Sequence, residues 1–127
     1  MEINCYTDAS YSKEKSLSVV AYKIGDNDIN VLYFQDVKNT QSEIMGIQHC
    51  IRVCNEEYPD AEIINIYTDC QNAWKHEWQP NVNLIKVKGH QPKRDMSPTD
   101  LIFKQVDKMA RKMMRQSAGK KCPESVG

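Results

Sequence analysis

The sequence predicts a single α/β domain built on a five-stranded mixed sheet with helices on both faces. Strand-like and helix-like segments follow one another along the 127 residues in the order βββαβαβα. The first three strands are joined by short turns, which favours an antiparallel meander, and the later strands alternate with helices. A chain of this length is typical of one domain.

The first three strands are predicted from their apolar residues and from the turns between them. Ile3–Thr7 forms a short strand, and Leu17–Ile24 and Ile29–Val37 alternate apolar and polar residues. The letters GDND separate the second and third strands, and such residues are typical of a tight turn.

A helix follows over residues 42–58, because its apolar residues recur every three or four positions, as Ile44, Ile47, Ile51 and Cys54. Pro59 ends this helix. The stretch IINIYT before Asp69 then forms the fourth strand. Its apolar character indicates a strand buried inside the sheet.

The last third of the chain supplies one strand and two helices. The letters QNAWKHEW predict a short helix that stops before Pro80, and Val82–Lys88 forms the fifth strand. Ser97 is a suitable N-cap and Pro98 a suitable first residue for a long final helix. We expect the domain to cover residues 1–115 and residues 116–127 to form a flexible tail.

Composition indicates an ordinary water-soluble protein, with 40% hydrophobic and 27% charged residues. No apolar run approaches the ~18 residues of a membrane span, so we expect no membrane association. The five cysteines include no CxxC pair, and reduced thiols in the cytoplasm explain them best. Cys50 and Cys54 with His49 suggest a zinc site, but core packing is the favoured interpretation.

The net charge is zero, yet the charges are unevenly distributed. Residues 1–69 contain 12 acidic and 5 basic side chains, whereas residues 70–127 contain 5 acidic and 12 basic ones. This asymmetry suggests an acidic site beside a basic, nucleic-acid-binding surface. A helix with a solvated basic face is the simpler alternative.

Four acids stand at positions where chemistry is expected. Asp8 and Asp69 each follow the letters YT at the end of a predicted strand, and Glu43 and Asp107 share helical stripes with apolar residues. Gathered carboxylates repel one another unless divalent cations keep them ionised. Oxygen ligands favour Mg²⁺ or Mn²⁺.

Each acid also has a purely structural explanation. Asp69 could cap the next helix and Asp8 could stabilise a turn. Glu43 fits a capping box that begins at Thr40. Asp107 could form a helical ion pair with Lys104 or Arg111. These explanations are separate, whereas one acidic site accounts for all four residues.

Five motifs in order resemble ribonuclease H type 1 over residues 1–115. The motifs are YTDAS at 6–10, NTQSE at 39–43, IYTDCQ at 66–71, VKGH at 87–90 and VDKMAR at 106–111. The resemblance implies that the two YTD strands lie side by side in an RNase H-like sheet. It also implies cleavage of the RNA strand of RNA/DNA hybrids.

The resemblance further assigns roles to particular residues. Two Mg²⁺ ions, with Mn²⁺ as a possible substitute, would be held by four carboxylates: Asp8, Glu43, Asp69 and Asp107. His90 would assist proton transfer or product release. Three polar residues would face the minor groove of the hybrid and read the 2′-hydroxyl, namely Asn39, Thr40 and Gln71.

The chain departs from the family at several places. Ala9 follows the first aspartate where glycine is usual, and only 20 residues separate Asp69 from His90, so the basic protrusion of some members is absent. We therefore expect the nearby bases, Lys93 and Arg94 among them, to contact phosphates. The long segment after His90 leaves Asp100 as a rival to Asp107, although Asp100 also suits a capping role.

Trp74 and Trp78 are assigned to core packing, with a stacking surface for DNA as the alternative. The expected protein is a monomer without an organic cofactor. Two other functions stay open: a related metal nuclease acting on double-stranded RNA or branched DNA, and a catalytically silent module that binds nucleic acid or protein.

Overall fold

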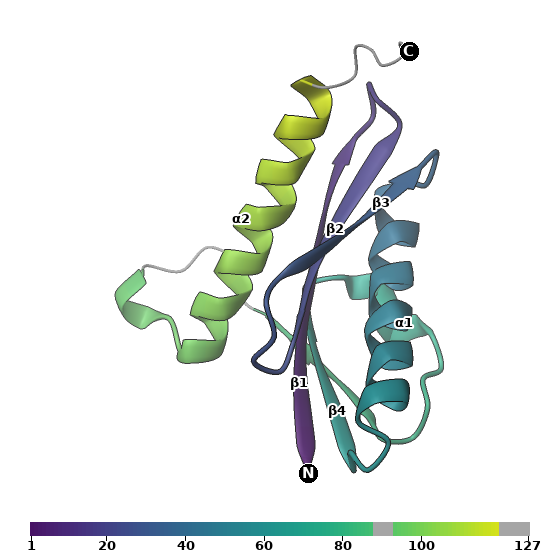
Figure 1. Ribbon diagram of the computed structural model, residues 1–127, viewed down its shortest axis with the longest axis vertical. Coiled ribbons are helices and arrows are strands. Elements are labelled where there is room, and N and C mark those ends of the chain that lie inside the picture. The colour runs from purple at the N-terminus through teal and green to yellow at the C-terminus, as the bar shows by residue number, and fades with distance from the viewer. Residues whose placement is uncertain (88–92, 120–127) are drawn as a thin grey trace.

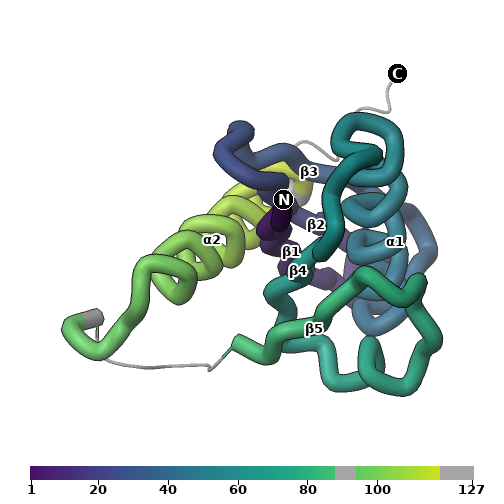
Figure 2. The backbone as a smooth tube through the Cα atoms, turned by 90° about the horizontal axis from the view of Figure 1, so that it is seen from below, coloured from purple at the N-terminus to yellow at the C-terminus, as the bar shows by residue number. Residues whose placement is uncertain are grey.

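The computed structural model describes residues 1–87 and 93–119. It contains a five-stranded mixed sheet in the order β3-β2-β1-β4-β5, with α1 and α2 on opposite faces (Figures 1 and 2). Strands β1, β2 and β3 pair antiparallel, and β1, β4 and β5 pair parallel. The predicted fold class is confirmed.

The elements follow the predicted order, with two short 3₁₀ turns called η1 and η2. Their bounds are β1 Glu2–Ser12, β2 Leu17–Ile24, β3 Asn30–Gln35, α1 Asn39–Glu57, β4 Ile63–Thr68, η1 Gln71–Lys75, β5 Val82–Lys86, η2 Lys93–Asp95 and α2 Pro98–Gly119.

Several predicted boundaries are wrong, and helix α1 begins three residues earlier than expected, at Asn39. Strand β1 does not end near Thr7 but continues to Ser12, because β2 pairs with it all the way from Cys5. The helix expected over QNAWKHEW is only the five-residue turn η1. Helix α2 runs to Gly119, so the first residues of the expected tail are helical. The rest of that tail lies outside the described residues.

The two faces of the sheet have different cores. Residues of β1 and β4 that point towards α1 form the larger one: Ile3, Cys5, Ile64 and Ile66 pack with Ile44, Ile47, Cys50 and Cys54. On the other face, Tyr6 and Ala21 pack against Val106 and Ala110 of α2. In a parallel strand buried on both faces, nearly every side chain is apolar. This explains why four of the first five residues of β4 are apolar or aromatic.

The cysteines of α1 belong to the core and not to a zinc site. Cys50 and Cys54 are fully buried, and the Cys54 sulfur lies 3.4 Å from that of Cys5 on β1. His49 uses its ring nitrogens elsewhere, with Nε2 3.1 Å from the Tyr22 hydroxyl and Nδ1 2.8 Å from Arg52.

Helix α1 approaches the sheet closely at Gly46. A Cβ atom at this position would lie 2.6 Å from Cγ1 of Val20 and 3.0 Å from Oγ1 of Thr7. Both distances are too short for ordinary packing, so only glycine lets the helix lie this close. Because Glu43 is one turn earlier on the same side of α1, this contact also sets its distance from β1.

Asparagine side chains connect the three parallel strands on the α2 side. Asn65 of β4 donates to Oδ1 of Asn4 at 3.0 Å, and Asn83 of β5 donates to Oδ1 of Asn65 at 3.1 Å. These bonds satisfy polar groups next to the area that α2 covers. No helix among residues 1–87 and 93–119 is long and apolar enough to cross a membrane.

Candidate active site

The two YTD sequences lie side by side in the sheet. Strands β1 and β4 run parallel in a register that places Tyr6 opposite Tyr67, and the two rings stack with centroids 4.8 Å apart. The same register brings Asp8 level with Asp69, because each aspartate lies two residues after its tyrosine. The repeated sequence therefore places two carboxylates together at the end of the parallel pairing.

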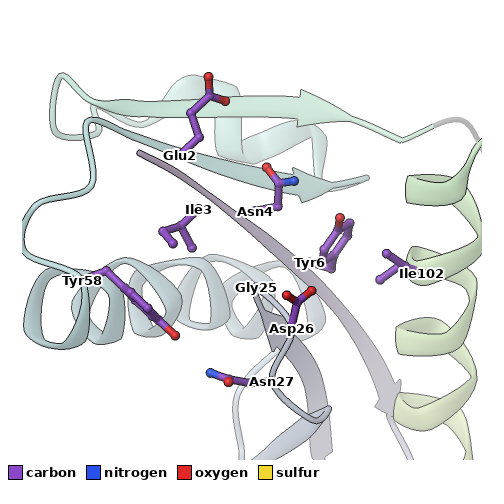
Figure 3. Close-up of a pocket in the computed structure, with 9 residues that line it drawn as sticks. All are labelled: Glu2, Ile3, Asn4, Tyr6, Gly25, Asp26, Asn27, Tyr58 and Ile102. Carbon is purple, nitrogen blue, oxygen red and sulfur yellow. The ribbon is translucent and has the colours of Figure 1, made fainter.

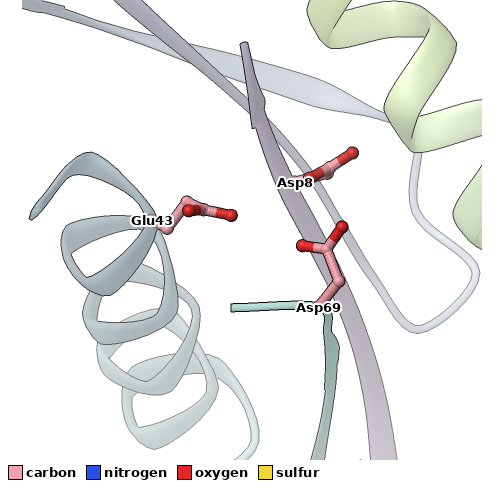
Figure 4. Close-up of side chains that lie close together, drawn as sticks. All are labelled: Asp8, Glu43 and Asp69. Carbon is pink, nitrogen blue, oxygen red and sulfur yellow. The ribbon is translucent and has the colours of Figure 1, made fainter. Parts of the chain in front are cut away.

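Glu43 joins these two aspartates from helix α1. One carboxylate oxygen from each of Asp8, Glu43 and Asp69 lies within 4.8 Å of the others. Figure 4 shows the three side chains pointing towards one another, with α1 on one side and α2 on the other. Asp8 is buried, Glu43 is half-buried and Asp69 is exposed, so the group opens to solvent on one side.

Local structure excludes three of the structural explanations. Asp69 does not cap η1, because the N-cap residue of η1 is Cys70. The N–H of Cys70 donates to Thr68 Oγ1 at 3.1 Å. Glu43 does not belong to a capping box, since α1 begins at Asn39 and its N-cap residue makes no side-chain hydrogen bond. Asp8 lies within β1 and not at its end, opposite Ala21 of β2.

Burial and mutual repulsion raise the pKa values of two members of the group. Burial, and after it the neighbouring carboxylates of Asp107 and Asp69, raises the pKa of Asp8 to about 9. Burial and the charge of Asp69 raise the pKa of Glu43 to about 7. Without a cation, the group therefore holds protons at neutral pH.

The arrangement fits a hard divalent cation. Its three carboxylates supply oxygen ligands only, as Mg²⁺ prefers. Asn39 donates from Nδ2 to Oε1 of Glu43 at 3.3 Å, and its Oδ1 is buried without a hydrogen-bond partner among the described residues. An unpaired buried oxygen beside a carboxylate group is a place for a donor from a ligand.

Asp107 lies beside Asp8 but is bound to a cation of its own helix. Arg111 donates through its Nε to Oδ1 at 3.2 Å and through Nη2 to Oδ2 at 2.5 Å. The ion-pair alternative for Asp107 is thus present, with Arg111 and not Lys104 as the partner. Asp107 still neighbours the site, because its carboxylate raises the pKa of Asp8.

Asp100, the rival fourth acid, caps α2. Its Oδ2 accepts from the Ser97 N–H at 3.1 Å, and its own N–H donates to Ser97 Oγ at 3.2 Å. This reciprocal pair is a capping box. Asp100 therefore has a structural role at the start of the helix, about two turns before Asp107, which neighbours Asp8.

The other predicted residues divide into those near the acids and those elsewhere. Thr40 and Gln71 are exposed, Thr40 beside Asn39 and Gln71 two residues after Asp69. Arg94 is 86% exposed and lies 3.9 Å from Asp95, in a turn set away from the sheet (Figure 2). His90 and the Lys93 side chain lie outside the described residues.

The two tryptophans differ. Trp78 packs against the larger core and donates from Nε1 to the Ala73 carbonyl at 2.8 Å, as predicted. Core packing is wrong for Trp74, which is 45% exposed. The i, i+4 spacing failed because η1 is a short 3₁₀ turn that ends at Lys75, so Trp78 lies beyond it and shares no helical face with Trp74.

A cavity of about 380 Å³ lies near the start of β1, away from the acids. Figure 3 shows its lining side chains: Glu2, Ile3, Asn4, Tyr6, Gly25, Asp26, Asn27, Tyr58 and Ile102. None of the three grouped carboxylates lines it. The three carboxylates instead open to solvent on one side.

Gly46 was not predicted from the sequence, and Asn39 was predicted only as a residue facing the minor groove, not as a partner of Glu43. Gly46 sets the approach of α1, and its signal was a glycine three residues after Glu43 on the core-facing side. Asn39 holds Glu43, and its signal was the i, i+4 spacing of a polar pair on a helix.

Sequence and structure comparisons assign this arrangement to a known class. The sequence profile of the RNase H family matches residues 1–118. The chain belongs to the RNase H family. No curated protein matches the sequence significantly.

Among solved structures, the chain is similar to the native protease-reverse transcriptase of prototype foamy virus, with a TM-score of 0.64 and 15% sequence identity. The match covers 87% of this chain and 20% of the foamy virus chain. The likeness shows a shared fold, and this chain spans about a fifth of that much longer one.

Proposed function

We propose that this protein is an endoribonuclease that hydrolyses the RNA strand of RNA/DNA hybrids with two divalent metal ions. The observation that carries the proposal is the register of β1 and β4, which sets Asp8 level with Asp69 within reach of Glu43. Membership of the RNase H family supports a nuclease of this type.

Asp8, Glu43 and Asp69 would hold the metal ions, with Asp107 as a fourth ligand on the α2 side. When bound, Mg²⁺ supplies positive charge that activates water and stabilises the leaving oxygen of an in-line displacement. Asp8 and Glu43 would release their protons when cations bind, because their raised pKa values reflect unfavourable charge in a cation-free site. Metal affinity would therefore increase with pH.

Recognition of RNA would fall to residues that border the acids. The unpaired Oδ1 of Asn39 can accept a hydrogen bond from a 2′-hydroxyl, while its Nδ2 orients Glu43. Exposed Thr40 and Gln71 border the same group. A 2′-hydroxyl donor is what distinguishes RNA from DNA at such a place. We assign proton transfer to His90 from the family resemblance.

A cleavage assay tests the proposal. The chain is incubated in Mg²⁺ with an end-labelled RNA/DNA hybrid, duplex RNA, duplex DNA and branched DNA. We expect internal cuts in the RNA strand of the hybrid only, and none with Asp69→Asn. Preferential cutting of duplex RNA or branched DNA would favour a related metal nuclease instead. Binding without cutting would indicate a catalytically silent module.

A further inference from the structure

Four cations form one row along helix α2. Lys104, Lys108, Arg111 and Arg115 follow the spacing i, i+4, i+7 and i+11, so they lie above one another on a single side of the helix. The row extends for roughly 16 Å at 1.5 Å per residue. Lys108, Arg111 and Arg115 are exposed and Lys104 is half-buried.

The row lies next to the side of α2 that reaches the acids. A second row with the same spacing stands one residue earlier: Phe103, Asp107, Ala110 and Met114. Its apolar members are buried against the sheet. Each residue of this second row is followed in the sequence by a cation. The row of cations is therefore rotated by about 100° around the helix axis from the row that contains Asp107.

The position of Arg111 joins the row to the site. Its guanidinium holds the Asp107 carboxylate, which neighbours Asp8 of the acidic group. The other three cations form no ion pair within the described residues. Their charges are therefore available to a partner.

The rest of α2 and all of α1 lack such a surface. The exposed side of α2 that is turned away from Asp107 carries Gln105, Gln116 and one cation, Lys112. Helix α1 has a single cation, Arg52, which contacts His49. Among the described helices, the cations beside the acids are thus concentrated on one side of α2.

We infer that the row of Lys104, Lys108, Arg111 and Arg115 binds the phosphate backbone of the nucleic-acid duplex that enters the acidic site. This inference rests on the proposed function, since a duplex must reach the carboxylates. A duplex presents one phosphate charge per ~1.7 Å of its axis, so a row of this length faces several phosphates. The row would add to the phosphate contacts expected of Lys93 and Arg94.

Charge relocation tests the inference. In an Asp69→Asn background that prevents cleavage, Lys108→Gln with Arg115→Gln removes two row cations without touching Asp107. A matched variant adds Gln105→Lys and Gln116→Arg. These two cations restore the net charge, but they lie about 100° further around the helix from Asp107. Glutamine, lysine and arginine have similar helix propensities, so the helix is preserved, and thermal melting checks the fold.

The measurement is duplex binding between 50 and 200 mM salt. We expect the double variant to bind at least about tenfold more weakly at low salt and to lose up to roughly 2 units of log–log salt slope. The relocated variant should not recover binding. Recovery would show that net charge alone matters, and an unchanged slope would exclude the row; either result overturns the inference.

Failure of the proposed function gives a different pattern. Phosphate contacts carry no sequence or sugar information, so the row should bind duplex DNA with the same salt slope as the hybrid. If the wild-type protein cuts no hybrid while the row variants still lose their slope on duplex DNA, the proposed reaction fails and the row stands. If the wild-type protein cuts the hybrid but the row variants keep the wild-type salt slope on both duplexes, only the inference about the row is overturned.

Discussion

Helix α1 packs against the sheet through Gly46, whereas α2 crosses the opposite face and holds Asp107 in an ion pair with Arg111. Both helices bring a carboxylate towards Asp8, but only Glu43 of α1 lies in the group of three. On α1, backbone packing sets the position of the acid. On α2, a neighbouring cation does so, and the row of cations lies on the adjacent side of that helix.

The difference indicates a division of labour between the helices. Helix α1 has almost no positive charge and contributes a carboxylate whose pKa is raised by burial. Helix α2 contributes positive charge that extends away from the acids. A nuclease needs both, since its metal site requires anions and its polyanionic substrate requires cations.

The largest effect should come from the acids that the two helices carry. Glu43→Gln removes a member of the group and should lower the cleavage rate by about 1,000-fold or more, because metal charge stabilisation is worth several kcal/mol. Asp107→Asn should lower the rate by roughly 10–100-fold, as expected for a residue at the margin of a metal site. Single-turnover cleavage of the hybrid measures both.

Asp100→Asn is the control on the same helix. It removes a cap and should cost ~0.5–2 kcal/mol of stability while changing the rate little. If Asp107→Asn proved more damaging than Glu43→Gln, or Asp100→Asn as damaging as either, the contrast between the helices would be wrong.

The packing of α1 gives the next effect. Gly46→Ala places a methyl group 2.6 Å from Cγ1 of Val20, so the helix must move outwards. Overpacking of this kind costs about 1–3 kcal/mol, partly offset by the better helix propensity of alanine. Denaturant unfolding should show the loss, and the cleavage rate should fall because Glu43 moves with the helix.

Val20→Ala provides the matched test, because it removes the atom that clashes. The stability loss from Val20→Ala should be smaller in the Gly46→Ala background than in the wild type, a coupling that a double-mutant cycle measures. Additive losses would mean that Val20 does not limit the approach of α1.

Much of the site could be predicted because its acids follow repeated or periodic patterns. The two YTD sequences indicated Asp8 and Asp69, and the helical stripes indicated Glu43 and Asp107. The continuation of β1 to Ser12 was missed because Asp8, Ala9 and Ser10 also suit a turn, although residues 9–12 alternate in polarity and pair with β2. Strand pairing of this kind depends on contacts distant in the chain.

The immediate partners of the acids were harder to predict than the acids. Both Lys104 and Arg111 have the spacing for an ion pair with Asp107, and only the folded helix selects Arg111. Trp74 was misplaced because its spacing suited an α-helix, and the turn proved to be 3₁₀. The row of cations can be found in the sequence once the buried stripe is known, since each residue of that stripe is followed by a cation.

The raised pKa of Asp8, which lies between the two helices, predicts that the free energy of unfolding depends on pH. Its pKa rises to about 9 in the folded protein without metal, so the folded state binds a proton more tightly than the unfolded chain. This contribution to stability is fully present below the ordinary pKa of an aspartate near 4 and is lost as the pH rises towards 9.

Asp8→Asn should therefore stabilise the protein in a chelator, by roughly 1–3 kcal/mol at pH 8 and by almost nothing at pH 4. Thermal melts across this range measure the difference, and the pH dependence due to Glu43 is common to both proteins. Saturating Mg²⁺ should stabilise the wild type and not the variant. A constant difference at every pH would show that charge on Asp8 is not the cause.

The smallest effect concerns the ion pair on α2. Arg111 occupies both oxygens of Asp107, so a metal ion must compete with it for that carboxylate. Because Arg111 is 60% and Asp107 26% exposed, the helical pair is worth only ~0.3–0.5 kcal/mol.

Arg111→Gln should lower the Mg²⁺ concentration for half-maximal thermal stabilisation by about twofold, measured without nucleic acid. Lys104→Gln is the control, since it removes the same charge from the row without contacting Asp107. An equal shift in both variants would assign the effect to the general field of the cations, and no shift in either would mean that Asp107 and its ion pair lie outside the metal site.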